Sequence, residues 1–114
     1  TNPEFDVIGD CDNGFCAVEK AEQLQPDIML LDINMDPMDG FEVAEQVLKK
    51  VPKTRIIAFS INHQPKYAIQ MIDLGARGYV TKTSSPREIA QSILEVHRGE
   101  VFICQEVKKN MSEE

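Results

Sequence analysis

The sequence predicts one α/β domain with a mainly parallel sheet and helices on both faces. Short apolar runs alternate regularly with stretches of helical periodicity, and the connections between them are short, without internal repeats. This alternation is typical of parallel strands joined by crossover helices. The chain has 114 residues, of which 42% are apolar, enough for one hydrophobic core and too little for two.

The first predicted unit is a strand followed by a helix. Residues 5–9 alternate apolar and polar side chains, as in a short strand, and the polar residues 10–14 form a turn. Apolar residues then recur every three positions over 15–21, and Pro26 stops the pattern. The spacing therefore predicts a helix that ends before this proline.

The second unit begins with a continuous apolar run at residues 28–31, which is typical of a strand covered on both faces by helices. The run ends at Asp32. After a turn over residues 34–40, an apolar stripe predicts a helix from Phe41 to Val51. The third strand is expected at residues 55–60.

The remaining elements carry clear end signals. A helix is predicted over residues 65–74 because a glycine follows where a left-handed cap is wanted, and residues 78–81 read as a short strand. Ser85 is then followed by a proline and, three residues after the serine, by Glu88, which is a capping-box helix start. This last helix is expected to end at Gly99.

Composition excludes several classes of function. No apolar run approaches the length of a membrane span and no leader is recognisable, so a soluble, cytoplasmic protein without a membrane partner is expected. The net charge is -7, mostly in the first 50 residues, which argues against direct binding of DNA phosphates. The cysteines are odd in number and form no C-x-x-C pair, so three reduced thiols are expected at Cys11, Cys16 and Cys104.

Three chemically complementary residues end successive strands. Functional sites in such sheets lie at the carboxyl ends of the strands, where the sequence places Asp32, Ser60 and Lys82. A carboxylate can accept a phosphoryl group, and a lysine ammonium and a serine hydroxyl can meet its charge. Taken singly, each residue is more simply a turn cap, a backbone hydrogen-bonding serine or a solvated lysine. Together they predict a phosphorylation site.

Two stretches resemble the receiver domains of response regulators, the CheY-like family with a flavodoxin-like fold. Residues 26–40 read PDIMLLDINMDPMDG and residues 75–82 read GARGYVTK, similar to the phosphoacceptor strand and the last strand of that family. The sequence TSSP that follows is similar to the LuxR/NarL-type branch. The resemblance makes residues 1–99 the receiver, from the end of its first helix onward. It makes residues 100–114 an extension or the start of a linker to an absent DNA-binding domain.

The resemblance implies a role for each site residue. Asp32 is similar to the phosphoacceptor, Ser60 to the hydroxyl residue that turns toward the phosphoryl group, and Lys82 to the basic residue that pairs with it. Tyr79 is similar to the switch aromatic whose pose follows. Asp32 and the backbone carbonyl of Asn34 are similar to ligands of Mg²⁺.

The implied function is a two-component switch that a sensor histidine kinase phosphorylates on Asp32 and that controls transcription. Such a receiver catalyses its own phosphorylation and dephosphorylation but is not a turnover enzyme, and it reaches DNA only through another domain. A homodimer is expected through a face carrying Ile69, Asp73, Tyr79 and Arg87. The alternative is a phosphorylation-independent pseudo-receiver that serves as a dimerisation or interaction module. A small hydrolase ranks last, because no histidine or second carboxylate is convincingly placed as a base.

The chain departs from the family pattern at its start. Receivers normally open with an apolar strand that ends in an acidic pair, followed by a helix, whereas the match here begins at the second strand. Without that pair, Mg²⁺ binding is expected to be weak or absent. Asp10 and Asp12 could substitute, although they more simply cap a turn. If the first strand and helix are truly missing, the exposed strand edges favour a rearranged or domain-swapped dimer.

A second departure lies beside the site. Receivers of this type usually have proline directly after the methionine that corresponds to Met35, but here Asp36 comes between Met35 and Pro37. The added carboxylate either repels a second negative charge on Asp32 or helps to attract Mg²⁺. In the next loop, His63 is expected to be a solvated histidine rather than a partner contact.

Overall fold

The computed structural model describes residues 14–24, 27–32 and 40–112. The predicted strand at residues 5–9, Asp36 and the candidate metal ligands Asp10, Asp12 and Asn34 lie outside these ranges. In chain order the elements are α1 (Gly14–Leu24), β1 (Ile28–Asp32), α2 (Gly40–Lys50), β2 (Arg55–Ser60), α3 (Pro65–Leu74), β3 (Gly78–Thr81), α4 (Pro86–His97), β4 (Phe102–Ile103) and α5 (Gln105–Ser112).

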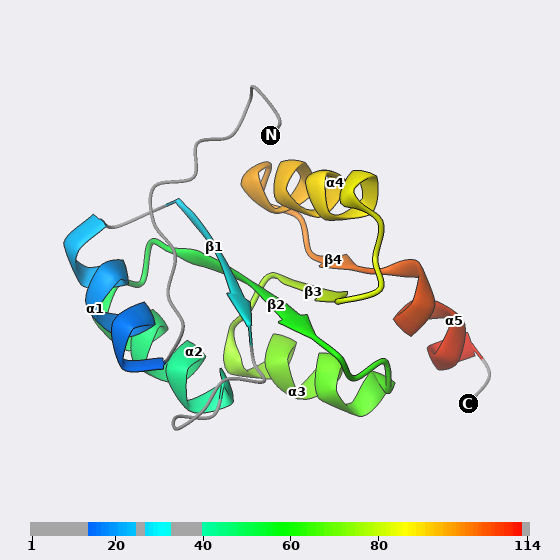
Figure 1. Cartoon of the computed structure of the whole chain (residues 1–114), viewed down its shortest axis with the longest axis horizontal. Coiled ribbons are helices and arrows are strands. Elements are labelled where there is room, and N and C mark those ends of the chain that lie inside the picture. The colour runs from blue at the N-terminus through cyan, green and yellow to red at the C-terminus, as the bar shows by residue number, and fades with distance from the viewer. Residues whose placement is uncertain (1–13, 25–26, 33–39, 113–114) are drawn as a thin grey trace.

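The described strands form one parallel sheet in the order β1-β2-β3-β4. Helix α4 covers one face, α2 and α3 cover the other, and α1 packs on α2 (Figure 1). The predicted α/β architecture with helices on both faces is confirmed. No described helix has the length and apolar composition to cross a membrane.

Strand β1 is less covered than predicted. Leu31 is buried, but Leu30 is 43% exposed. Leu30 pairs with Ile57 in the parallel register and so points to the same face of the sheet as Ile57, the face covered by α4. In the described sheet β1 is an outer strand with a neighbour on one side only. The expectation of a strand covered on both faces is therefore wrong for Leu30.

The predicted helix ends have the expected geometry. Gly75 closes α3 with φ 124°, and a Cβ there would lie 2.9 Å from Leu48 Cδ1, so glycine is required both by conformation and by space. At the start of α4, Ser85 Oγ accepts a hydrogen bond from the Glu88 backbone N–H at 3.1 Å. The Glu88 carboxylate, however, accepts from the Gln105 N–H at 2.8 Å and thereby joins α4 to α5.

The C-terminal extension is more ordered than a linker start suggests. Strand β4 pairs with the outer side of β3, and α5 packs against α3. Cys104 and Val107 are fully buried, and Met111 packs against the core. A two-residue strand is too short to show alternation, and α5 is mostly polar. The spacing of these three residues is the signal that could have revealed α5.

Candidate functional site

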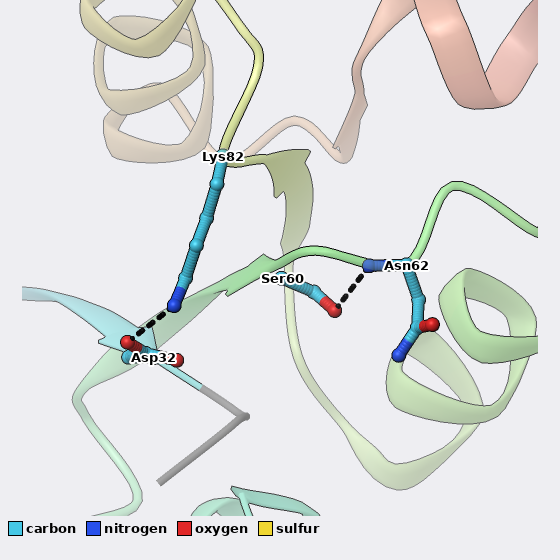
Figure 2. A network of polar contacts seen from close by, with 4 residues as sticks. All are labelled: Asp32, Ser60, Asn62 and Lys82. Carbon is cyan, nitrogen blue, oxygen red and sulfur yellow. Dashed lines mark hydrogen bonds and ion pairs between the residues drawn. The ribbon is translucent and has the colours of Figure 1, made fainter.

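The register of the sheet brings the three predicted site residues to one edge. Asp32, the last residue of β1, lies opposite Phe59, and Ser60, the last residue of β2, lies opposite Thr81. Lys82 directly follows β3, and its backbone N–H donates to the Ser60 carbonyl oxygen at 2.8 Å. Figure 2 shows Asp32, Ser60 and Lys82 at this carboxyl edge of the sheet.

Asp32 and Lys82 form a direct ion pair. Lys82 Nζ donates to Asp32 Oδ2 at 2.8 Å, and the side chains are 33% exposed for Lys82 and 37% exposed for Asp32. The ammonium also lies 5.9 Å from the centre of the Phe59 ring. Partly exposed pairs contribute at most about 1 kcal/mol to stability. The ion pair therefore adds little to stability. What it provides for a reaction is an accessible carboxylate with a cation fixed beside it.

Ser60 is engaged away from Asp32. Its side chain is fully buried, and its Oγ accepts a hydrogen bond from the Asn62 backbone N–H at 3.0 Å. In Figure 2 the Ser60 hydroxyl points toward Asn62, whereas the Lys82 side chain points toward Asp32. The serine thus closes the turn after β2. To meet a group on Asp32, its hydroxyl must break this bond.

Tyr79 is linked to Ser60 through the backbone of Asn62. The Tyr79 hydroxyl donates to the Asn62 carbonyl oxygen at 2.8 Å, and the tyrosine is fully buried. The backbone of Asn62 therefore binds both candidate switch side chains. Its N–H donates to Ser60, and its carbonyl oxygen accepts from Tyr79. Sequence reasoning missed Asn62. A serine at a strand end, two residues before an asparagine, was the available signal for a serine turn.

Burial raises the pKa of the Tyr79 hydroxyl above its ordinary value. We expect the ultraviolet absorbance of phenolate to show Tyr79 titrating above pH 10. The chain has two tyrosines and no tryptophan, so subtracting the curve of a Tyr79→Phe variant isolates Tyr79. Because the folded pKa is raised, the stabilisation from the neutral phenol is complete below the unfolded pKa. It is lost as the pH rises through the folded value. Titration of Tyr79 at or below pH 10 would contradict this burial.

The predicted interface residues divide into two groups. Asp73 and Arg87 are exposed, and Ile69 is 50% exposed. Tyr79, in contrast, contributes no surface because its side chain is fully buried. The expectation that Tyr79 lies in the interface is therefore wrong for this conformation. The dimer through Ile69, Asp73 and Arg87 stays a prediction.

The described residues do not by themselves fit a magnesium ion. Mg²⁺ takes oxygen ligands in near-octahedral geometry, and the described residues predicted to ligate it supply one carboxylate, Asp32. Within residues 14–24, 27–32 and 40–112 no group of three or more histidine, cysteine, aspartate or glutamate side chains could hold a metal. The ligand expected from Asn34 and the possible substitutes Asp10 and Asp12 lie outside these ranges. Weak Mg²⁺ binding stays a prediction.

Comparison with known proteins agrees with the resemblance found in the sequence. Residues 1–94 match the response regulator receiver domain family. The chain is 34% identical over 111 residues to the response regulator protein VraR of Staphylococcus saprophyticus, covering 97% of this chain and 53% of that protein. It thus spans about half the length of the curated relatives it matches.

Two solved structures are close in shape. A LuxR-family response regulator from Aurantimonas sp. gives a TM-score of 0.91 at 24% identity, covering 97% of this chain and 79% of the other. The receiver domain of the putative response regulator NarL from Mycobacterium tuberculosis gives 0.78 at 34% identity, covering 83% of this chain and 77% of the other. At 24% identity the first likeness concerns the fold alone. Because it covers 97% of this chain, it reaches into the C-terminal extension.

Proposed function

Because this chain belongs to the response regulator receiver domain family and is 34% identical to the NarL receiver domain, we propose that it is a switch of the LuxR/NarL branch that carries a phosphoryl group on Asp32. The observation that carries the proposal is the ion pair between Asp32 Oδ2 and Lys82 Nζ at 2.8 Å, on the strand edge that also holds Ser60. A receiver of a two-component system implies a sensor histidine kinase as the donor.

The proposed transfer needs a nucleophile and a nearby cation. An oxygen of the Asp32 carboxylate attacks phosphorus, the P–N bond of the donor phosphohistidine breaks, and a P–O bond to Asp32 forms. Lys82 offsets the charge on the phosphoryl oxygens and reduces their repulsion from the carboxylate. The Ser60 hydroxyl then donates a hydrogen bond to a phosphoryl oxygen after releasing the Asn62 N–H. This makes the chain a phosphoacceptor rather than a turnover enzyme.

The output of the parent protein is also part of the proposal. The matched relatives are about twice as long as this chain, and one is the transcriptional regulatory protein DegU of Brevibacillus brevis. We infer that phosphorylation controls transcription through a DNA-binding domain outside this chain, in the cytoplasm. Homodimerisation through Ile69, Asp73 and Arg87 belongs to the same proposal.

The test is direct phosphorylation of the purified chain. We expect acetyl phosphate with Mg²⁺ to add one phosphoryl group to the native protein, measured by intact mass, and none to an Asp32→Asn variant. A parallel sample with EDTA in place of Mg²⁺ measures how far transfer depends on the metal. An unchanged mass of the native chain would contradict the proposal and favour the phosphorylation-independent module. An equal adduct on Asp32→Asn would move the site elsewhere.

A further inference from the structure

Helix α5 bridges the two loops that adjoin the candidate phosphoryl-binding residues Ser60 and Lys82. One loop connects β3 to α4 and contains Lys82, and the other connects β2 to α3 and begins after Ser60. Each loop is hydrogen-bonded to a different end of α5, by side chains that play no part in the transfer proposed above. The helix therefore lies where it can respond to a change in either loop.

The first anchor holds the N-terminal end of α5. Glu106 Oε2 accepts from the Thr83 hydroxyl at 2.7 Å and from the Thr81 hydroxyl at 3.0 Å. These threonines flank Lys82 in the chain. The hydrogen bonds from Thr83 and Thr81 hold the pKa of Glu106 below its ordinary value. The Gln105 N–H is in turn bound to Glu88 on α4.

The second anchor holds the C-terminal end of α5. Asn110 Nδ2 donates to the His63 carbonyl oxygen at 2.9 Å, and its amide also lies 3.3 Å from His63 Nδ1. The expectation that His63 is merely a solvated loop residue is therefore incomplete. His63 directly follows Asn62, whose backbone is held by Ser60 and Tyr79. This anchor thus lies one residue from the backbone that the Ser60 and Tyr79 hydroxyls hold.

We propose that α5 is a latch whose docking depends on the state of Asp32, an inference that rests on the proposed function. When Ser60 turns toward the phosphoryl group, the Asn62 N–H loses its acceptor and the turn carrying the His63 carbonyl is released. Asn110 then loses a fixed partner, and the C-terminal end of α5 loosens from α3. Helix α5 stands at the C-terminal side of the domain (Figure 1), so its release changes how any following segment is held.

The coupling must act in both directions. If phosphorylation weakens α5 docking, then weakening α5 must favour the phosphorylated arrangement of the loops. An Asn110→Ala variant cuts the second anchor without touching Asp32, Ser60 or Lys82. Lys109→Ala is the matched control, because it shortens an exposed side chain at the neighbouring helical position.

Hydrogen exchange measured by mass spectrometry on the whole chain tests the latch. With acetyl phosphate and Mg²⁺, we expect the α5 amides of phosphorylated native protein to exchange about threefold to tenfold faster, as for loss of one hydrogen bond. The amides of α4 serve as an unchanged internal reference. Asn110→Ala should show the faster α5 exchange before phosphorylation and respond less to it, whereas Lys109→Ala should behave as the native chain.

The outcomes separate the latch from the function beneath it. A phosphoryl adduct with unchanged α5 exchange overturns the latch and leaves the phosphorylation switch intact. Equal behaviour of Asn110→Ala and Lys109→Ala also overturns it, because the anchor to His63 is then irrelevant. An unchanged native mass overturns the proposed function, and the latch with it. Faster exchange of α5 that also occurs in Asp32→Asn counts against the latch, since the effect would not pass through Asp32.

Discussion

Replacement of Lys82 by methionine is expected to slow formation of the phosphoryl adduct on Asp32 about a hundredfold. Methionine keeps an unbranched, apolar stem in the place of the lysine stem but removes the ammonium that lies 2.8 Å from Asp32 Oδ2. The carboxylate and the incoming phosphoryl group are both negative, so the loss of this cation raises the barrier to their approach. Fixed donors at developing charge are typically the largest single contribution to such barriers.

The control for Lys82→Met is Lys53→Met. Lys53 is an exposed lysine in the connection between α2 and β2, remote in the chain from every predicted site residue, and its replacement changes the net charge by the same amount. Initial rates of adduct formation, followed by intact mass at equal Mg²⁺ and acetyl phosphate, compare the two variants. Equal rates would show that Lys82 does not assist transfer. Thermal melts should differ little, because a partly exposed ion pair adds at most about 1 kcal/mol.

The sequence predicts that Asp32, Ser60 and Lys82 lie at one edge of the sheet, because the strands are parallel and follow one another in the chain. Each residue ends, or directly follows, a strand with a clear apolar body, and the carboxyl ends of neighbouring parallel strands share one edge. For Ser60, the sequence allowed a bond to the backbone as well as a role facing Asp32, and it did not decide between the two. The orientation of its hydroxyl depends on a bond to the Asn62 backbone, and that backbone is also held by Tyr79, which is distant in the chain.

Elements with strong end signals were predicted well, and those whose order depends on tertiary contacts were not. Helix α4 has a serine cap and a proline in its first turn, and β2 is a clear apolar run. Helix α5 has eight residues and a mostly polar composition, and isolated helices of this length are unstable in water. Its order comes from Cys104 and Val107 in the core and from distant partners such as Glu88. Local patterns carry little of this information.

The core is expected to be sensitive at Ile57, where replacement by alanine should lower the free energy of unfolding by about 3 to 4 kcal/mol. Ile57 is fully buried in β2. A Cβ built on Gly78 would lie 3.1 Å from one of its Cγ atoms and 3.3 Å from Val96 Cγ2, so the isoleucine fills the space above a residue without a side chain. Neither Gly78 nor the stiff Val96 can close the resulting cavity.

Ile69→Ala is the matched control, since the same three carbons are removed from a side chain that is 50% exposed on α3. Its cost should stay below about 1 kcal/mol, because half of the side chain is already in water and alanine is the better helix former. Urea unfolding measures both variants, and an unchanged m-value would show that the native and unfolded surfaces are preserved. If Ile57→Ala cost no more than Ile69→Ala, the sheet core could relax around the missing atoms. The close packing of Ile57 on Gly78 and α4 is expected to hold β2 in place, and Ser60 ends this strand. A small cost of Ile57→Ala would show that this packing does not fix the position of β2.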